Sequence, residues 1–71
     1  MYHYIYMIKS IKNGKIKTYV GYSNNLKKRL AAHNSGKGAK STRGRMWKII
    51  FKKKFLSKSS ALKAEYFLKK K

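Results

Sequence analysis

An Asn-Gly pair at positions 13 and 14 separates two stretches of alternating side chains, residues 2–8 and 16–22. Asn-Gly is a strong signal for a two-residue β-hairpin turn, because both residues tolerate the positive φ angles that the turn requires. The two stretches are therefore expected to pair as antiparallel strands. Both faces of residues 2–8 are largely apolar, so this stretch is predicted to be a central strand with neighbours on both sides.

The register of this hairpin brings two tyrosines together. With a two-residue loop, Ile8 lies opposite Tyr19 and Tyr6 lies opposite Gly21. Tyr6 and Tyr19 then share one face of the sheet as diagonal neighbours, and a register shift of two residues would keep them on the same face. Because tyrosine is common in strands for packing alone, a purely structural role for both side chains stays open.

A short amphipathic helix is predicted at 26–34, directly after the second strand. Residues 23–25, Ser-Asn-Asn, offer side chains that can cap its first turn. Arg29 and His33 are one helical turn apart, so they project together from the helix. A phenol, a guanidinium and an imidazole are thus brought near one another by local structure. A lone histidine near a helix end is more often a surface residue, which is the simpler interpretation of His33.

The second half of the chain continues the same pattern. A glycine-rich basic loop at 35–45 precedes a third strand at 46–55, and serines at 57–60 can cap a last helix at 61–69. The order strand, strand, helix, strand, helix predicts an α+β fold, in which helices pack on a small three-stranded sheet in one domain over 1–71. The predicted core consists of Ile5, Met7, Val20, Leu26, Leu30, Trp47, Ile49, Phe51, Leu62, Phe67 and Leu68.

Basic residues outnumber acidic ones by 20 to 1, which gives a formal net charge of +19. Folding does not require this imbalance, because like charges repel across a small surface. A polyanionic partner, DNA or RNA, explains it best. A lysine-biased composition stays open, since 17 of the 20 basic residues are lysine. An anionic membrane surface is disfavoured, because the lysines are spread over all the predicted elements.

The composition also argues against certain metal sites, disulfides and membrane-spanning segments. The chain has no cysteine and only two histidines, which argues against disulfides and against a zinc site of several imidazoles. No apolar run approaches the roughly 20 residues of a membrane-spanning helix. No signal-peptide pattern opens the chain, so a cytoplasmic location is expected.

Glu65 is the only acidic residue, and helical periodicity places it within an apolar arc that consists of Ala61, Leu62, Ala64 and Leu68. A carboxylate on an inward face is unfavourable unless it is paired or binds a metal. Two interpretations stay open. Glu65 is either the counter-ion of Arg29 or a lysine, or a ligand for a divalent cation such as Mg²⁺ or Mn²⁺ that also binds water and a substrate phosphate.

Taken together, these segments resemble the GIY-YIG nuclease family, especially its small stand-alone bacterial members, over nearly the whole chain. Residues 4–6, Tyr-Ile-Tyr, and 19–21, Tyr-Val-Gly, stand where the family has Gly-Ile-Tyr and Tyr-Ile-Gly. Arg29 and His33 match its Arg-x-x-x-His helix. Residues 33–44 look like the loop of the stand-alone members, and 61–65 match the helix that carries the family's glutamate.

The resemblance implies a three-stranded antiparallel sheet flanked by helices, and metal-dependent hydrolysis of a phosphodiester. Tyr19 would be the general base that activates water, and His33 and Tyr6 would help to position or deprotonate it. Arg29 would hold the scissile phosphate, and Glu65 would bind one Mg²⁺ or Mn²⁺ ion. Nearby cations and the metal would lower the phenol pKa toward a working value. All five side chains are expected to line one open cleft.

These features predict an endonuclease that cuts DNA with little sequence preference. The basic loop resembles a phosphate-contacting segment, so we expect Lys37, Lys40, Arg43 and Arg45 to contact nucleic acid. The alternative is a non-catalytic nucleic-acid-binding module with the same fold.

Overall fold

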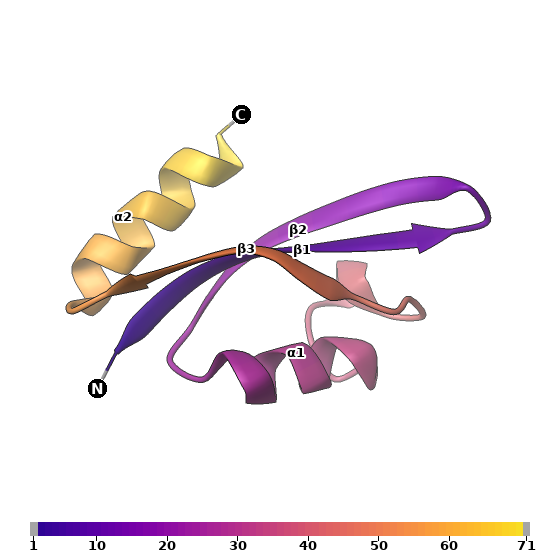
Figure 1. Ribbon diagram of the computed structural model, residues 1–71, viewed down its shortest axis with the longest axis horizontal. Coiled ribbons are helices and arrows are strands. Elements are labelled where there is room, and N and C mark those ends of the chain that lie inside the picture. The colour runs from indigo at the N-terminus through magenta and orange to yellow at the C-terminus, as the bar shows by residue number, and fades with distance from the viewer. Residues whose placement is uncertain (1, 71) are drawn as a thin grey trace.

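The computed structural model describes residues 2–70. Its elements are β1 (His3–Lys12), β2 (Lys15–Ser23), α1 (Leu26–Asn34), the one-turn 3-10 helix η1 (Lys40–Thr42), β3 (Lys48–Phe55) and α2 (Lys58–Lys69). The three strands form an antiparallel sheet in the order β2-β1-β3, with the two α-helices on opposite sides of it (Figure 1). The α+β fold, the element order and the central place of β1 are as predicted.

The β1–β2 hairpin has the predicted turn and register. Asn13 has a φ of 52° and Gly14 a φ of 75°, the left-handed values that a two-residue turn needs. Both predicted cross-strand pairs are found, Ile8 with Tyr19 and Tyr6 with Gly21. The strands are longer than predicted, because pairing continues up to the residues that flank the turn.

Side-chain caps determine where the helices begin. Asn25 caps α1 by accepting a hydrogen bond from the Lys28 amide at 3.1 Å, so this helix has the predicted bounds. Ser57 caps α2 by accepting from the Ser60 amide at 3.2 Å, so α2 begins three residues before the predicted start. Among the described residues, no helix is long and apolar enough to cross a membrane.

The core is divided between the two faces of the sheet. On the face toward α1, buried Tyr6, Ile8 and Trp47 form a cluster, and the partly buried side chains that pack against it are Tyr19, Leu26, Leu30 and Ile49. On the α2 side, the buried residues are Ile5 and Ala61. Tyr6 and Ile8 were not among the predicted core residues.

Three predicted core residues are exposed, namely Phe51, Leu62 and Phe67. Helix α2 packs more closely on β1 and β2 than on β3, which leaves Phe51 on the edge strand uncovered. On α2 itself, the less exposed side chains are Ala61, Ala64, Glu65 and Leu68. Leu62 and Phe67 lie outside this stripe, whereas Glu65 lies within it as predicted.

Candidate active site

His33 of α1 is fully buried, with 0% of its surface exposed, contrary to the simpler expectation of a surface histidine. Its Nε2 atom lies 2.8 Å from the Tyr6 hydroxyl of β1. Its Nδ1 atom lies 2.8 Å from the Thr42 hydroxyl, which in turn donates to the Ala39 carbonyl at 2.8 Å. A strand, a helix and the following loop are therefore joined by one chain of buried hydrogen bonds.

The direction of each bond follows from what each group can donate. The single hydroxyl proton of Thr42 goes to the Ala39 carbonyl, which can only accept. The Thr42 oxygen must then accept from His33, so Nδ1 carries the imidazole proton. Nε2 of the neutral ring is left as an acceptor, and the Tyr6 hydroxyl donates to it.

The pKa shifts of Tyr6 and His33 both favour the neutral forms of the two side chains. Burial, and to a lesser degree the charge of Arg29, lower the pKa of His33 below its usual 6.5. Burial raises the pKa of Tyr6 above its usual 10.0, and this outweighs the lowering by Arg29. The cation of Arg29 thus lowers the pKa of the Tyr6 phenol, but burial has the larger effect. Near neutral pH, an intact phenol donates to an uncharged imidazole.

The lowered pKa of His33 has a consequence for stability. Below about pH 6.5 the unfolded chain binds a proton at His33 more readily than the folded protein does, so the free energy of unfolding should fall as the pH falls. The stabilising contribution is complete above about pH 6.5 and declines below it. Urea denaturation between about pH 8 and about pH 5 measures this, and a His33→Asn variant should lose the dependence. A matched His3→Asn variant should retain it; equal pH dependence in both variants would contradict the assignment to His33.

Arg29 of α1 lies beside both tyrosines. Its guanidinium is hydrogen-bonded to Tyr6 and Tyr19, and the bond to Tyr6 is the main cause of the raised pKa of Arg29, which keeps it cationic. Its Nε atom is buried and has no hydrogen-bond partner among the described residues. Arg29 also lines a hollow of about 430 Å³, together with Lys28, Lys58, Ala32 and residues 22–25. A cation with a spare donor next to such a hollow is suited to an anion.

Tyr19 is partly exposed, unlike Tyr6. Its ring centroid lies 5.1 Å from that of His33 and 6.5 Å from that of Tyr6. It lines a second hollow of about 410 Å³ between β2 and the end of α2, where Lys69 places its Nζ atom 5.7 Å from the Tyr19 ring centre. Of the two tyrosines, only Tyr19 borders open space in this way.

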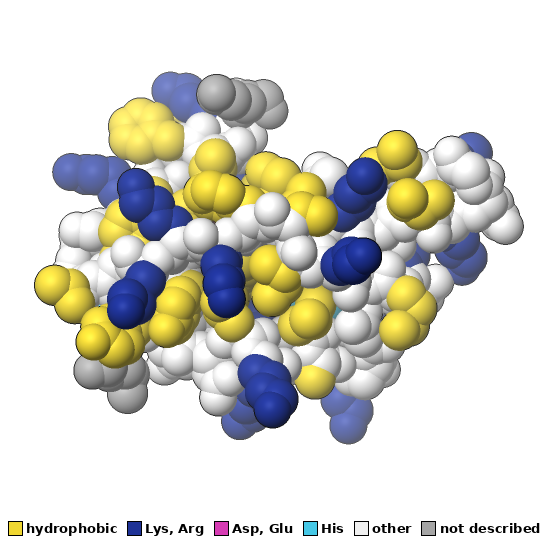
Figure 2. Space-filling model, viewed as in Figure 1, with side chains coloured by type: hydrophobic (Ala, Val, Ile, Leu, Met, Phe, Trp, Pro, Cys, Tyr) yellow, Lys and Arg dark blue, Asp and Glu magenta, His cyan; other side chains and the backbone are white. Residues whose placement is uncertain are grey.

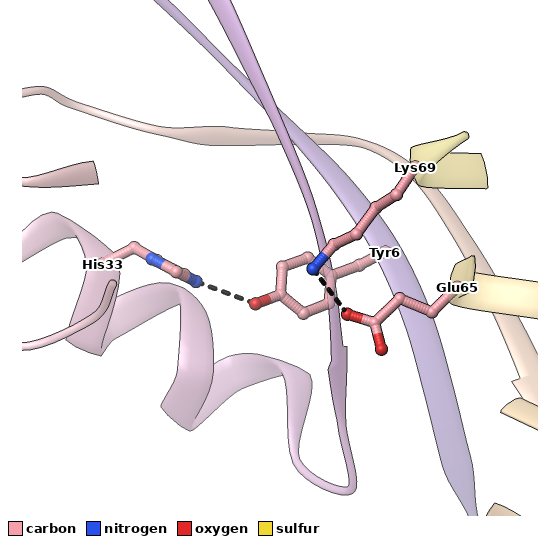
Figure 3. Close-up of polar contacts among 4 residues, drawn as sticks. All are labelled: Tyr6, His33, Glu65 and Lys69. Atoms are coloured by element: carbon pink, nitrogen blue, oxygen red, sulfur yellow. Dashed lines mark hydrogen bonds and ion pairs between the residues drawn. The ribbon is translucent and has the colours of Figure 1, made fainter. Parts of the chain in front are cut away.

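Glu65 of α2 approaches the same cluster from the opposite side of Tyr6 to His33 (Figure 3). Its carboxylate forms an ion pair of 3.1 Å with Lys69, one helical turn later, and its side chain is 17% exposed. Burial is the main cause of the raised pKa of Tyr6, and the Glu65 charge is the smallest of the causes that raise it. One of the two predicted interpretations, a lysine partner for Glu65, is therefore present in the structure.

The donor set also fits a divalent metal. The described residues contain no group of three or more histidine or acidic side chains that could enclose an ion. Mg²⁺ does not need such an enclosure, because it keeps several waters and commonly binds one or two carboxylates plus a substrate phosphate. Glu65 offers one partly exposed carboxylate of this kind, provided that Lys69, whose side chain is 51% exposed, turns away.

Two glycines are required by this packing. A Cβ atom at Gly21 would overlap the Tyr6 hydroxyl, and one at Gly38 would overlap Nδ1 of His33. Gly21 is in β2 and Gly38 is in the loop after α1. The bare backbone at these two positions leaves the space in which Tyr6, His33 and Thr42 form their hydrogen bonds.

The predicted single open cleft is not found. Arg29 and Tyr19 border two different hollows, and neither hollow is lined by Tyr6 or His33. The reason is that Tyr6 and His33 satisfy each other's hydrogen bonds in the interior and pack against the core. Four of the five predicted side chains, Tyr6, Tyr19, Arg29 and His33, lie together, and Tyr6 and His33 are buried among them. The contact of Glu65 is with Lys69, and its charge acts on Tyr6.

The basic residues of the loop divide into two groups. Lys37, Lys40 and Arg43 are exposed. Arg45 instead donates from Nε to the Ser10 hydroxyl at 3.1 Å and from Nη2 to the Lys15 carbonyl at 3.0 Å. Arg45 therefore braces the hairpin as well as carrying charge.

Thr42 and Lys69 belong to the site and were not predicted. Thr42 lies nine residues from His33 and reaches it because Trp47 holds the loop, donating from Nε1 to the Thr42 carbonyl at 2.8 Å. No local spacing indicates that contact. Lys69, by contrast, is four residues after the only carboxylate, a spacing that favours an ion pair on a helix.

Comparisons with known proteins agree with this arrangement. A UPF0213 protein of Oceanobacillus iheyensis is 44% identical over 68 residues, which cover 94% of this chain and 76% of that protein. UPF0213 protein YazA of Bacillus subtilis is 44% identical over 69 residues, covering 96% of this chain and 67% of that protein. The solution NMR structure of UPF0213 protein BH0048 from Bacillus halodurans has 40% identity and a TM-score of 0.54, and covers 100% of this chain and 73% of that one.

A family model described as the GIY-YIG catalytic domain matches residues 2–71. This match spans nearly the whole chain and includes both tyrosine strands, the Arg-His helix and the glutamate helix. Membership implies a nuclease type of activity and a nucleic acid substrate. The chain therefore belongs to the GIY-YIG catalytic domain family.

Proposed function

We propose that this protein is an endonuclease that hydrolyses DNA phosphodiester bonds with little sequence preference and requires a divalent metal ion. The observation that carries the proposal is the convergence of Tyr19, Arg29 and Glu65, from three different elements, around the buried Tyr6–His33 pair. A base, a cation for the phosphate and a carboxylate for a metal are the groups that this reaction needs.

Tyr19 is the better of the two tyrosines for activating water. The Tyr6 hydroxyl is buried and already donates to His33, whereas Tyr19 borders a hollow. Tyr19 is therefore the proposed general base, and the guanidinium of Arg29 lies beside its hydroxyl. Tyr6 and His33 are positioning residues in this mechanism, since Tyr19 and Arg29 pack against them.

Arg29 is the residue proposed to hold the scissile phosphate. Its Nε–H is a buried donor with no acceptor within the part of the chain that the structure describes, and such a group costs about 1–3 kcal/mol. A phosphate in the adjacent hollow, which Arg29 lines, would offer acceptor oxygens to its guanidinium. Lys28 and Lys58 line the same hollow and add positive charge where the backbone would pass.

Glu65 is the proposed metal ligand, with water and substrate oxygens completing the coordination. A bound Mg²⁺ or Mn²⁺ ion supplies Lewis-acid stabilisation of the charge on the phosphate. Low sequence preference follows from the charge of +19 and from the many lysines, because contacts to phosphates carry no sequence information.

Supercoiled plasmid DNA provides the direct test of this function. Incubation with Mg²⁺ or Mn²⁺ should produce nicked circles, and EDTA should prevent this. Salt-sensitive binding that is indifferent to EDTA, with no nicking in either metal, would instead identify a non-catalytic binding module.

Thr42→Val tests the positioning of His33. The variant keeps the side-chain shape but leaves Nδ1–H of His33 buried without an acceptor, so unfolding free energy should fall by about 1–3 kcal/mol. The pH profile of nicking should also change, because His33 no longer has a fixed tautomer. Thr42→Ser should restore both properties, and the exposed Thr18→Val is the matched control. If Thr42→Ser behaves like Thr42→Val, the hydroxyl is not what positions His33.

A further inference from the structure

The hollow that Arg29 lines is larger than a phosphate alone requires. Its volume of about 430 Å³ falls within the range of roughly 300–1,000 Å³ that is typical of sites for small organic ligands. Its lining residues come from the end of β2, the turn that follows, α1 and the first residue of α2. The hollow therefore has room for more of a nucleotide than its phosphate group.

Tyr22, near the end of β2, contributes an aromatic side chain to this hollow and is only partly buried. Its hydroxyl lies 2.6 Å from Nδ1 of His3 on the neighbouring strand β1. The two rings are nearly parallel, with 17° between their planes. The contact with His3 fixes the direction of the phenol ring before any ligand binds, which lowers the cost of ordering it on binding.

The charged side chains that line the hollow are all basic. They are Lys28, Arg29 and Lys58, whereas Glu65, the only acidic residue of the chain, is not among the lining residues. The Lys58 ammonium lies 5.9 Å from the centre of the Tyr22 ring, so a cation and an aromatic ring lie next to each other. The charge of the hollow is therefore complementary to an anionic occupant.

Charge alone does not single out this hollow, because basic side chains are spread over the face of the molecule that Figure 2 shows. The distinguishing feature is the aromatic ring beside the cations. Proteins that bind single-stranded nucleic acid use this combination, in which bases stack on aromatic side chains and phosphates lie at basic ones. An occupant that satisfies both the ring and the cations of this hollow carries a base as well as a phosphate.

We propose that this hollow binds a nucleotide that is not base-paired, with its base stacked on Tyr22 and its phosphate at Arg29. A nucleotide inside a duplex is already stacked and paired, so it has to leave the double helix before its base reaches Tyr22. Tyr22 is thus a specificity-determining residue that favours DNA with unpaired nucleotides. The inference rests on the proposed role of Arg29 at the scissile phosphate and names the class of DNA that this site prefers.

Fluorescence anisotropy in EDTA tests the proposal without cleavage, so its failure is distinct from a failure of the proposed nuclease activity. The probes are a labelled oligothymidylate and an abasic oligomer of the same length, which carry the same number of phosphates. Wild-type protein should bind the oligothymidylate roughly tenfold more tightly. Tyr22→Leu should lose most of this preference, and Tyr22→Phe, which keeps the ring, should retain most of it.

Paired DNA provides a second comparison for the same variant. Tyr22→Leu should bind a blunt duplex as tightly as the wild type does, because the bases of that duplex are stacked on one another. It should bind the same duplex with a single-stranded overhang more weakly than the wild type. Tyr22-dependent binding of oligouridylate, with none of oligothymidylate, would overturn the assignment to DNA.

Tyr66 offers a matched control. Its ring is exposed and has the Lys70 ammonium 5.4 Å from its centre, but Tyr66 does not line the hollow. Tyr66→Leu should therefore leave the preference for the oligothymidylate unchanged. Lys58→Gln should weaken the binding of both oligomers alike and reduce the slope of log affinity against log salt by about 0.7.

A photo-crosslink formed by the wild-type protein gives an answer even if Tyr22→Leu proves unstable. On irradiation, 5-iododeoxyuridine in a single strand couples to an aromatic side chain that lies against it, and the coupled peptide should be the one that contains Tyr22. Coupling only at other aromatic residues would overturn the proposal. So would an equal preference for the oligothymidylate in the wild type and in a folded Tyr22→Leu variant.

Discussion

Tyr19→Phe is expected to lower the rate of plasmid nicking by roughly 10²–10⁴-fold, the range typical of losing a general base. The ring remains, so its packing beside His33 and Tyr6 should be kept. Only the hydroxyl is lost, together with its hydrogen bond to Arg29. Affinity for duplex DNA and the urea midpoint should therefore stay close to those of the wild type, while single-turnover cleavage falls.

Tyrosine-to-phenylalanine substitutions at two other positions distinguish a catalytic role of the hydroxyl from a structural one. Tyr66→Phe, on the exposed side of α2, should leave cleavage unchanged. Tyr6→Phe removes the donor to buried Nε2 of His33, so it should lower the stability as well as the rate. If Tyr6→Phe abolished cleavage without loss of stability while Tyr19→Phe stayed active, Tyr6 would be the base.

Glu65→Gln is the second substitution with a large expected effect. Cleavage should fall by at least roughly 10²-fold, because the amide keeps the shape of the side chain but removes the charge that would bind the metal. Mn²⁺ binding, followed by electron paramagnetic resonance in the absence of DNA, should weaken in parallel. This readout does not depend on turnover.

Lys69→Gln distinguishes a metal ligand from a structural counter-ion. It breaks the same ion pair but leaves the Glu65 carboxylate in place. A pair whose lysine is half exposed contributes about 0–1 kcal/mol, so neither substitution should unfold the protein. If Glu65 is a metal ligand, cleavage should be lost in Glu65→Gln and kept in Lys69→Gln. Lys69→Gln should also bind Mn²⁺ at least as tightly as the wild type. Equal loss of activity and stability in both variants would make the pair structural.

The parts of the fold that depend on local chemistry were predictable. The Asn-Gly turn gave the hairpin register, and therefore the shared face of Tyr6 and Tyr19, because two left-handed residues leave one pairing of the flanking strands. The cap at Asn25 and the one-turn spacing of Arg29 and His33 are equally local. Position 65 on the inward stripe of α2 followed from helical periodicity in the same way.

The exposed predicted core residues show where local pattern is insufficient. Phe51 alternates correctly for a buried strand position, but it lies on an edge strand that α2 covers less closely than β1 and β2. Which part of a sheet a helix covers depends on how the two pack, and the periodicity of either element does not contain that information.

The amino-acid sequence alone determined the hairpin, the helices and the set of chemical groups that gather beside the sheet. Tertiary structure alone decided that the Tyr6 hydroxyl donates to His33 and that Thr42 fixes the imidazole tautomer. It also decided that Nε of Arg29 has no acceptor among residues 2–70 as described. The reason is physical: a turn or a cap is settled within a few residues, whereas the partner of a buried polar group depends on which distant segments pack around it.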